Sequence, residues 1–221
     1  MGNSDEYYDV VIATPGFSFH PEYVKSLVAT CQELSRRGLT YKFVNRASSS
    51  VNTARELTAL DSDSLSFVQF APVAGLDQSQ YGKIFWIDSD ISWSVNDFMR
   101  LLENALDIVS GVYVLDEVGS VACTLLNKDR MPVRLNKSEF VSMDACIKVS
   151  AVGFGFLAVR SGVFEMMDRE WFRAGVLSVG DVDVNMGEDY AWCFRAGDMG
   201  FAIYVDSAVR LTHHKSTTYT V

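Results

Sequence analysis

The sequence has no C-x-x-C pair and few cysteines of any kind. Its four cysteines lie far apart along the 221 residues, at Cys31, Cys123, Cys146 and Cys193. A zinc site needs closely spaced pairs and a small secreted domain needs many cysteines, so neither class is indicated. We expect buried, reduced thiols and a cytoplasmic protein.

Long apolar runs and an excess of positive charge are also missing. No segment approaches 18 consecutive apolar residues, and the first eight residues are too acidic and polar for a signal peptide. The net charge is −9 at pH 7, whereas a nucleic-acid surface has to be basic. We therefore predict no membrane span and no nucleic-acid partner. A small phosphate ligand remains compatible, because a metal ion can supply positive charge locally.

Two common catalytic motifs are absent, and a third match is misplaced. There is no G-x-x-x-x-G-K-[ST] P-loop and no G-x-S-x-G elbow. Residues 153–158 formally match G-x-G-x-x-A, but that dinucleotide motif closes a first strand and opens a helix, and here it lies late in an apolar run. The two glycines are better explained by a backbone that approaches a ligand, or by a sharp bend.

The most informative segment is Ile84-Phe85-Trp86-Ile87-Asp88-Ser89-Asp90. Its apolar run ends in two carboxylates one residue apart, which predicts a buried strand with both aspartates at its carboxyl end. Ligands bind at that edge of open α/β sheets. Two carboxylates there suit Mg²⁺ or Mn²⁺, and these ions suit phosphate. Residues 94–97 form a capping box for the next helix, so neither aspartate is needed as its cap, although a solvated turn is the simpler reading.

The hydrophobic pattern predicts one α/β domain over residues 1–221. Apolar runs at 10–13 and 41–44 enclose a helical pattern between Pro21 and Gly38, which indicates a parallel strand–helix–strand unit with a right-handed crossover. Further helices are expected from 51, from 94, over 161–167 and over 189–196. Further strands are expected at 84–87, 108–115, 121–126, 133–135, within 147–159, at 203–205 and at 209–211. Segment 172–186 is expected to be irregular.

Two late polar pairs could carry chemistry. Glu188 and Asp189 begin a predicted helix, where acids are favoured by the helix dipole, but a carboxylate beside a phosphate site is also a ready general base. His213 and His214 follow the last strand. Alternation places His213 on the face of Val209 and His214 on the other, although two tail histidines often have no function.

Taken in order, these segments resemble the GT-A type glycosyltransferases, compact family-2-like enzymes with a D-x-D motif. The resemblance covers nearly the whole chain, with two departures: Glu56 stands where relatives often have Asn, and no glycine closely follows His213. It implies a Rossmann-like GT-A fold, with a mostly parallel central sheet flanked by helices and a small antiparallel second sheet. The matching segments are 10–15, 52–55, 87–90, 152–156, 187–189 and 205–213.

The resemblance also implies an activity and a set of site residues. A sugar would move from a nucleotide-diphosphate sugar, UDP- or GDP-linked, to a hydroxyl of a glycan or another acceptor. Asp90 and His213, with Asp88 acting through water, would hold Mn²⁺ or, less favourably, Mg²⁺. Asp189 would be the base of an inverting reaction, and Glu188 would bind or orient the acceptor. The donor would contact Thr14, Pro15, Asn52, Arg55, Asp88, Ser89 and Asp90, and the acceptor side would include Gly153, Phe154 and Gly155.

Three other functions remain open at this stage. A sugar-phosphate nucleotidyltransferase shares the fold, but it would carry a glycine-rich basic loop after the first strand, which residues 14–17 lack. A metal-dependent phosphohydrolase would release phosphate without an acceptor. An inactive nucleotide-sugar-binding module is the non-enzyme alternative.

Overall fold

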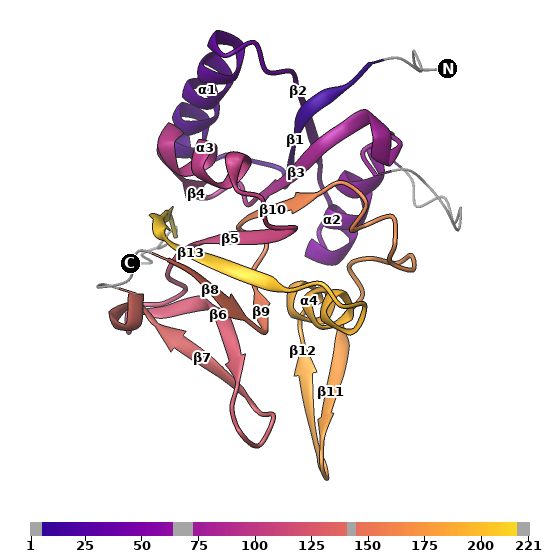
Figure 1. Ribbon diagram of the computed structural model, residues 1–221, viewed down its shortest axis with the longest axis vertical. Coiled ribbons are helices and arrows are strands. Elements are labelled where there is room, and N and C mark those ends of the chain that lie inside the picture. Colours follow the sequence, from indigo (N-terminus) through magenta and orange to yellow (C-terminus); the bar gives the residue numbers. More distant parts are fainter. Residues whose placement is uncertain (1–5, 64–72, 141–144, 216–221) are drawn as a thin grey trace, which may run out of the picture.

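A seven-stranded sheet forms the centre of the protein in a computed structural model that describes residues 6–63, 73–140 and 145–215 (Figure 1). In spatial order it contains β2 (Tyr41–Arg46), β1 (Tyr8–Pro15), β3 (Tyr81–Ile87), β10 (Phe156–Arg160), β5 (Ile108–Val112), β13 (Ile203–Arg210) and β8 (Cys146–Val149). Five of these strands run in one direction, and β10 and β8 run against them. The sheet is thus mostly parallel, as predicted.

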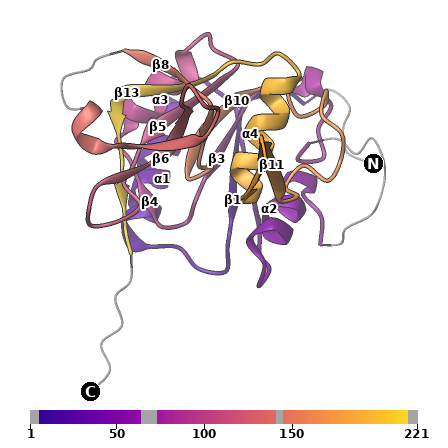
Figure 2. The same cartoon turned by 90° about the horizontal axis from the view of Figure 1, so that it is seen from below.

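Four helices cover the two faces of this sheet (Figure 2). On one face, Val10 and Ile12 of β1 pack with α1 (Pro21–Arg36) and α3 (Val95–Glu103). On the other face, Val11 and Ala13 pack with α2 (Val51–Leu60) and α4 (Glu188–Asp198). Alternate residues of one strand therefore face opposite cores, which explains why the strands are apolar throughout rather than alternating.

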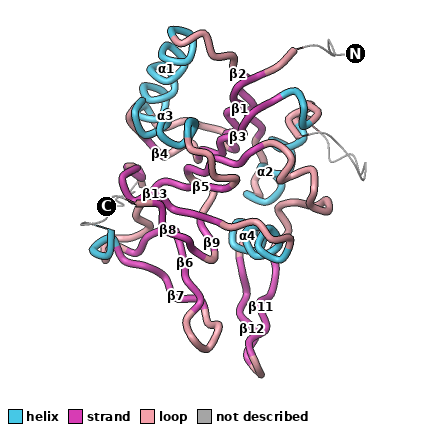
Figure 3. Tube along the Cα trace, in the orientation of Figure 1, coloured by secondary structure: helices cyan, strands magenta, loops and turns pink. Residues whose placement is uncertain are grey.

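Smaller antiparallel pairings complete the fold, and the predicted second sheet is confirmed. Strands β6 (Ser120–Leu126) and β7 (Pro132–Asn136) project as a hairpin, and β11 (Gly175–Val179) and β12 (Val182–Met186) form a second hairpin beside them (Figure 3). Two short pairings join β9 (Ala151–Val152) to β6 and β4 (Ile91–Ser92) to β14 (Thr212–His213). The described residues also contain 3₁₀ turns at Gln78–Gln80 and Lys137–Phe140.

The prediction that segment 172–186 is irregular was wrong. Strands β11 and β12 pair from Gly175↔Met186 to Val179↔Val182, so residues 180 and 181 are the whole loop. Gly180 has φ +59°, a conformation that glycine adopts without steric cost and that tight hairpin turns require. The missed signal was therefore Gly-Asp between two valine-rich runs.

Three smaller predictions also need correction. Residues 161–167 form consecutive turns and not a helix, because Gly162 at φ +94° lies outside the helical region. The strands expected at 203–205 and 209–211 are one strand, β13, with an irregular register between them. Of the four cysteines, Cys123 and Cys193 are buried, but Cys31 is only partly buried and Cys146 is exposed.

The expected capping box at the start of α3 is confirmed. The Ser94 hydroxyl accepts a hydrogen bond from the Asp97 amide, and the Asp97 carboxylate accepts one from the Ser94 amide. Asp88 and Asp90 are therefore free of this capping role. None of the helices in the described part of the chain is long and apolar enough to cross a membrane.

Candidate active site

The two aspartates lie at the carboxyl end of β3, as predicted. The strand ends at Ile87, and the amide of Asp88 donates to the Gly155 carbonyl at 3.1 Å. A tight turn follows, in which the Ile91 amide donates to the Asp88 carbonyl at 3.0 Å. The chain then enters β4, whose only partner among the described strands is β14. This pairing sets Ile91 opposite His213, which brings the histidine to the turn.

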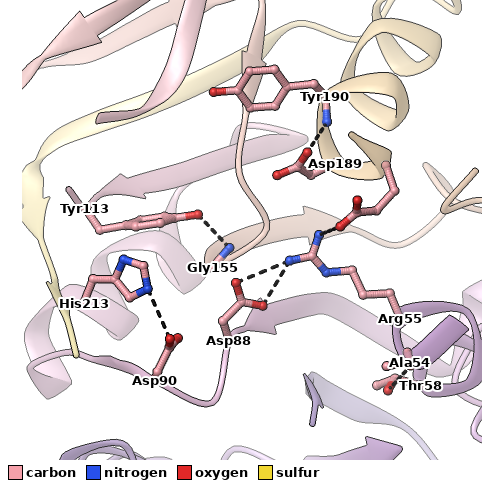
Figure 4. A network of polar contacts seen from close by, with 11 residues as sticks. Ala54, Arg55, Thr58, Asp88, Asp90, Tyr113, Gly155, Asp189, Tyr190 and His213 are labelled. Atoms are coloured by element: carbon pink, nitrogen blue, oxygen red, sulfur yellow. Dashed lines mark hydrogen bonds and ion pairs between the residues drawn. The ribbon is translucent and has the colours of Figure 1, made fainter. Parts of the chain in front are cut away.

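Asp90 and His213 form a direct pair (Figure 4). The Nε2 atom of His213 lies 3.2 Å from Oδ2 of Asp90, and its Nδ1 atom lies 3.0 Å from the Val114 carbonyl oxygen. The hydrogen bond to Asp90 raises the pKa of His213. Burial favours a higher pKa for Asp90, but the hydrogen bond and charge of His213 outweigh it, so the pKa of Asp90 is lowered.

These two side chains fit a divalent cation. In a neutral imidazole, donation from Nδ1 to Val114 leaves the Nε2 lone pair available, the arrangement expected of a metal-binding histidine. Two neighbouring ligands of an octahedral ion are about 3 Å apart, close to the observed separation. No group of three or more His, Cys, Asp or Glu in the described residues could hold a metal. The other positions would have to come from ligand oxygens and water, which is common for Mg²⁺.

Asp88 is paired with Arg55 and not with His213. The Nη2 atom of Arg55 lies 3.1 and 3.3 Å from the two carboxylate oxygens of Asp88, and its Nη1 atom lies 2.6 Å from Oε1 of Glu188. The Arg55 side chain is only 5% exposed, and its guanidinium lies over the Phe154 ring, 5.3 Å from the centroid. Burial opposes the charge of Arg55, but Asp88, Asp189 and Glu188 outweigh it and raise its pKa.

Asp189 lies in the first turn of α4, beside this ion-pair network. Its Oδ1 accepts a hydrogen bond from the Tyr190 amide at 2.7 Å. Burial raises the pKa of Asp189 and the Glu188 charge adds to the rise, while Arg55 opposes it. The carboxylate lines a cleft of about 510 Å³, here called the Asp189 cleft. Other lining residues include Tyr113, Thr124, Arg134, Gly153 and Asn185.

Gly153 and Gly155 make room for Tyr113. A Cβ atom on Gly153 would lie 2.3 Å from the Tyr113 hydroxyl oxygen, and one on Gly155 would lie 2.6 Å from Tyr113 Cζ. The same hydroxyl accepts a hydrogen bond from the Gly155 amide at 3.0 Å. The close approach expected of these glycines therefore involves a side chain of this protein. Phe154 is 1% exposed and packs in the core.

The remaining donor-side residues are divided between the core and a second cleft. Thr14 and Pro15 are buried at the end of β1, where the Thr14 hydroxyl bonds the Tyr23 hydroxyl at 2.6 Å, and Asn52 is half-buried at the start of α2. Ser89 and Asp90 line a cleft of about 650 Å³. His214 lines it too, bonded to Ser92 and stacked on His20, so both histidines lie near Asp90 although they point to different partners.

Tyr113 was not among the site residues predicted from the sequence. Its ring meets the His213 ring edge-on at 5.8 Å between centroids, and it also lines the Asp189 cleft. Tyr113 thus joins the Asp90–His213 pair to the cleft. The available signal was its place just after β5, at the sheet edge where ligand-binding residues gather.

No family model matches this sequence, and no curated protein matches it. Solved structures with a similar fold exist. The crystal structure of A197 from STIV is 17% identical, with a TM-score of 0.57 over 95% of this chain and 86% of that chain. The structure of GalNAc-T7 with UDP, GalNAc and Mn²⁺ is 10% identical, with a TM-score of 0.50 over 96% of this chain and 44% of that chain.

These similarities establish the fold. The mixed sheet, its flanking helices and the small antiparallel pairings are those of a GT-A-like glycosyltransferase fold. This chain spans less than half the length of the GalNAc-T7 chain. At such low identities the likeness extends to the fold alone, and an activity has to be argued from the site.

Proposed function

We propose that this protein is a glycosyltransferase that moves a sugar from a nucleotide-diphosphate sugar to a hydroxyl acceptor. One observation carries the proposal: Tyr113 contacts His213 of the cation-compatible pair and also lines the cleft that holds Asp189. A place for a diphosphate and a place for a base therefore adjoin each other. A hydrolase could use the same base on water, so the feature that favours transfer is the cleft beside Asp189, which has room for an acceptor.

The chemistry assigned to the residues is an inverting displacement. The acceptor oxygen bonds to the anomeric carbon of the donor sugar as the bond from that carbon to the diphosphate breaks. Asp189 takes the proton of the acceptor hydroxyl, and its raised pKa brings it closer to the neutral range in which general bases are most effective. A divalent cation on Asp90 and His213 would supply positive charge for the leaving diphosphate.

The structure suggests altered roles for Glu188 and Arg55. Glu188 was expected to bind or orient the acceptor and Arg55 to contact the donor, but the two side chains form an ion pair of 2.6 Å with each other. We propose that Arg55 positions the two sides of the site, because it ties Asp88 at the end of β3 to Glu188 at the start of α4. Donor contacts of Arg55 remain a prediction.

A donor panel is the most direct test. Thermal unfolding is measured with UDP- and GDP-sugars in the presence of Mn²⁺, and a donor at 100 times its Kd should stabilise the protein by about 2.7 kcal/mol. GalNAc-T7 was crystallised with UDP and Mn²⁺, so UDP-sugars are the first choice. The stabilising donor is then incubated with hydroxyl acceptors, and the linkage of any product is read by NMR.

Each result has a distinct meaning. A transferred sugar with inverted anomeric configuration supports the full proposal. A retained configuration rejects Asp189 as the base of a single displacement. Release of free sugar or phosphate at the same rate with and without acceptor indicates a hydrolase, and donor binding with no reaction indicates a binding module. If no nucleotide-sugar binds, the proposal fails.

A further inference from the structure

The Asp189 cleft lies between two hairpins whose side chains face it. On one side, β6 and β7 pair so that Thr124 stands opposite Arg134, and both residues line the cleft. Directly paired residues of an antiparallel ladder project to the same face of the sheet. On the other side, β12 contributes Val184, Asn185 and Met186. Figure 1 shows the two hairpins side by side below α4.

Thr124 lines this cleft and carries an unused polar group. The residue is 3% exposed, and its hydroxyl oxygen is buried and has no hydrogen-bond partner among the described groups. A buried hydroxyl without a partner costs about 1–3 kcal/mol, so such groups are rare and call for an explanation. A rotation of the Thr124 side chain about χ1 would turn the hydroxyl toward the cleft, where a ligand that accepts its hydrogen bond would remove this cost.

Arg134 supplies the positive charge of the cleft. It lines the cleft together with Tyr190, where its charge opposes the burial that raises the Tyr190 pKa to about 12. Among the described residues, no carboxylate forms an ion pair with Arg134. Arg134 is thus an exposed arginine at a cleft whose other charged lining residue is Asp189.

The positive charge of Arg134 lies in an otherwise acidic part of an acidic protein. The protein has a net charge of −9, and the facing hairpin carries Asp181 and Asp183. These carboxylates would repel an anion that approaches Asp189, unless a positively charged residue lay close to the path of the anion. Arginine is well suited to that task, because its planar fork matches carboxylate and phosphate oxygens.

We propose that the acceptor of this reaction carries an anionic group, a carboxylate, phosphate or sulfate, which binds Arg134 and Thr124 while a hydroxyl of the same molecule faces Asp189. The inference rests on the proposed transfer, since it concerns the acceptor of that reaction. Apolar residues of the same cleft, Leu115, Val184 and Met186, would contact the carbon face of a sugar ring. The class expected is therefore an acidic or phosphorylated sugar.

The test compares matched sugars by NMR titration of the labelled protein. Glucuronic acid and glucose 6-phosphate are the anionic probes, and glucose is the neutral one. A charge-assisted hydrogen bond predicts at least roughly tenfold tighter binding of an anionic probe. A comparison of the Kd values of glucuronic acid and glucose 6-phosphate then shows whether a carboxylate or a phosphate is preferred.

Three variants locate the effect. Arg134→Gln should abolish the preference for the anionic probe. Arg130→Gln removes the same charge from the exposed turn of the same hairpin, outside the cleft, and should keep the preference. Thr124→Val removes only the hydroxyl and should weaken anionic binding about fivefold. Because that hydroxyl has no partner, this variant should fold at least as stably as the wild type. Weaker binding by Thr124→Val would therefore not be explained by misfolding.

The inference is overturned if glucose binds as tightly as both anionic probes, or if none of the three binds. It is also overturned if Arg134→Gln weakens the nucleotide-sugar and leaves anionic sugars unaffected, because Arg134 would then serve the donor. A donor titration on the same samples separates the two proposals. Donor binding without an anionic preference rejects this inference alone. An anionic preference without donor binding rejects the proposed function, and the Asp189 cleft would then be an anion site that is not an acceptor site.

Discussion

At the scale of single residues, Asp189 and Asp90 have opposite environments although both are aspartates at one sheet edge. Burial raises the pKa of Asp189, whereas His213 lowers that of Asp90. Two carboxylates whose pKa values are moved apart are suited to two roles. The raised one suits a proton acceptor, and the lowered one suits a cation ligand that stays ionised.

The first prediction concerns turnover. Asp189→Asn keeps the shape and an oxygen for the Tyr190 amide but removes the base, so turnover should fall by roughly 10²–10⁴ while donor affinity stays nearly unchanged. Steady-state rates and donor calorimetry measure the two quantities. Asp198→Asn, at the exposed end of the same helix, is the matched control. Near-normal turnover in Asp189→Asn would assign the base to another group.

The second prediction follows from the raised pKa of Asp189. A carboxyl whose pKa is higher in the folded protein binds protons more readily there, so its contribution to stability is greatest at low pH. That contribution falls as pH rises from the ordinary aspartate pKa through the folded value. Asp189→Asn should therefore be more stable than the wild type at pH 7, and the difference should vanish near pH 3. Urea unfolding across this range checks the sign, and a difference that grows toward low pH would contradict it.

At the scale of elements, Arg55 of α2 connects two segments that the chain separates by 100 residues. Its ion pairs reach Asp88 after β3 and Glu188 at the start of α4. Both contacts are short, and Arg55 and Glu188 are almost fully buried. Solvent screening is therefore weak for the Arg55–Glu188 pair, and removal of Arg55 would leave a buried carboxylate without compensation.

The third prediction concerns stability. Arg55→Met should destabilise the protein by about 3 kcal/mol, because breaking one partner of a buried ion pair leaves the other charge unpaired. Arg37→Met removes an arginine from solvent-exposed pairs with Glu33 and Glu103 and should cost much less, because water screens such pairs. Chemical denaturation of both variants gives the comparison. Equal losses would mean that the Arg55 network is not a principal link between α2, β3 and α4.

At the scale of the whole molecule, the cation-compatible site depends on the pairing of β4 with β14. Asp90 and His213 are 123 residues apart, and the Asp90 carbonyl also accepts a hydrogen bond from the His214 amide at 2.8 Å. The site therefore exists only once nearly the whole described chain has folded. Its two ligand atoms alone would hold a metal weakly, and a diphosphate would have to supply further oxygens.

The fourth prediction concerns the cation. Donor binding should weaken strongly when Mn²⁺ is removed with EDTA, and in Asp90→Ala and His213→Ala. Asp129→Ala, at the exposed turn of the β6–β7 hairpin, should bind like the wild type. Isothermal titration with and without EDTA measures the effect. Alternation placed His214 on the face away from His213, which predicts a smaller effect of His214→Ala, but its position in the Asp90 cleft makes a moderate loss the better expectation. Equal donor affinity in the presence and absence of EDTA would reject a cation-dependent site.

Local patterns in the sequence were sufficient for much of the fold. The strand at 84–87 followed by two aspartates, the Pro21 helix and the Ser94 capping box all depend on neighbours within one turn or one strand, so the residues themselves determine them. The β11–β12 hairpin was missed although its signal was local, because the Gly180-Asp181 turn was not recognised. Gly162 similarly prevents the helix expected at 161–167.

Periodicity and capping residues encode the apolar strands, most of the helix ends and the two aspartates at the end of β3. Long-range contacts, in contrast, determine which charges meet. Asp88 and Asp90 are two residues apart, yet one pairs with Arg55 and the other with His213. Likewise, Thr124 and Arg134 line one cleft with Asp189. Such pairings depend on long-range strand register and on burial, which set the distances and the desolvation of each charge, and no local pattern encodes them.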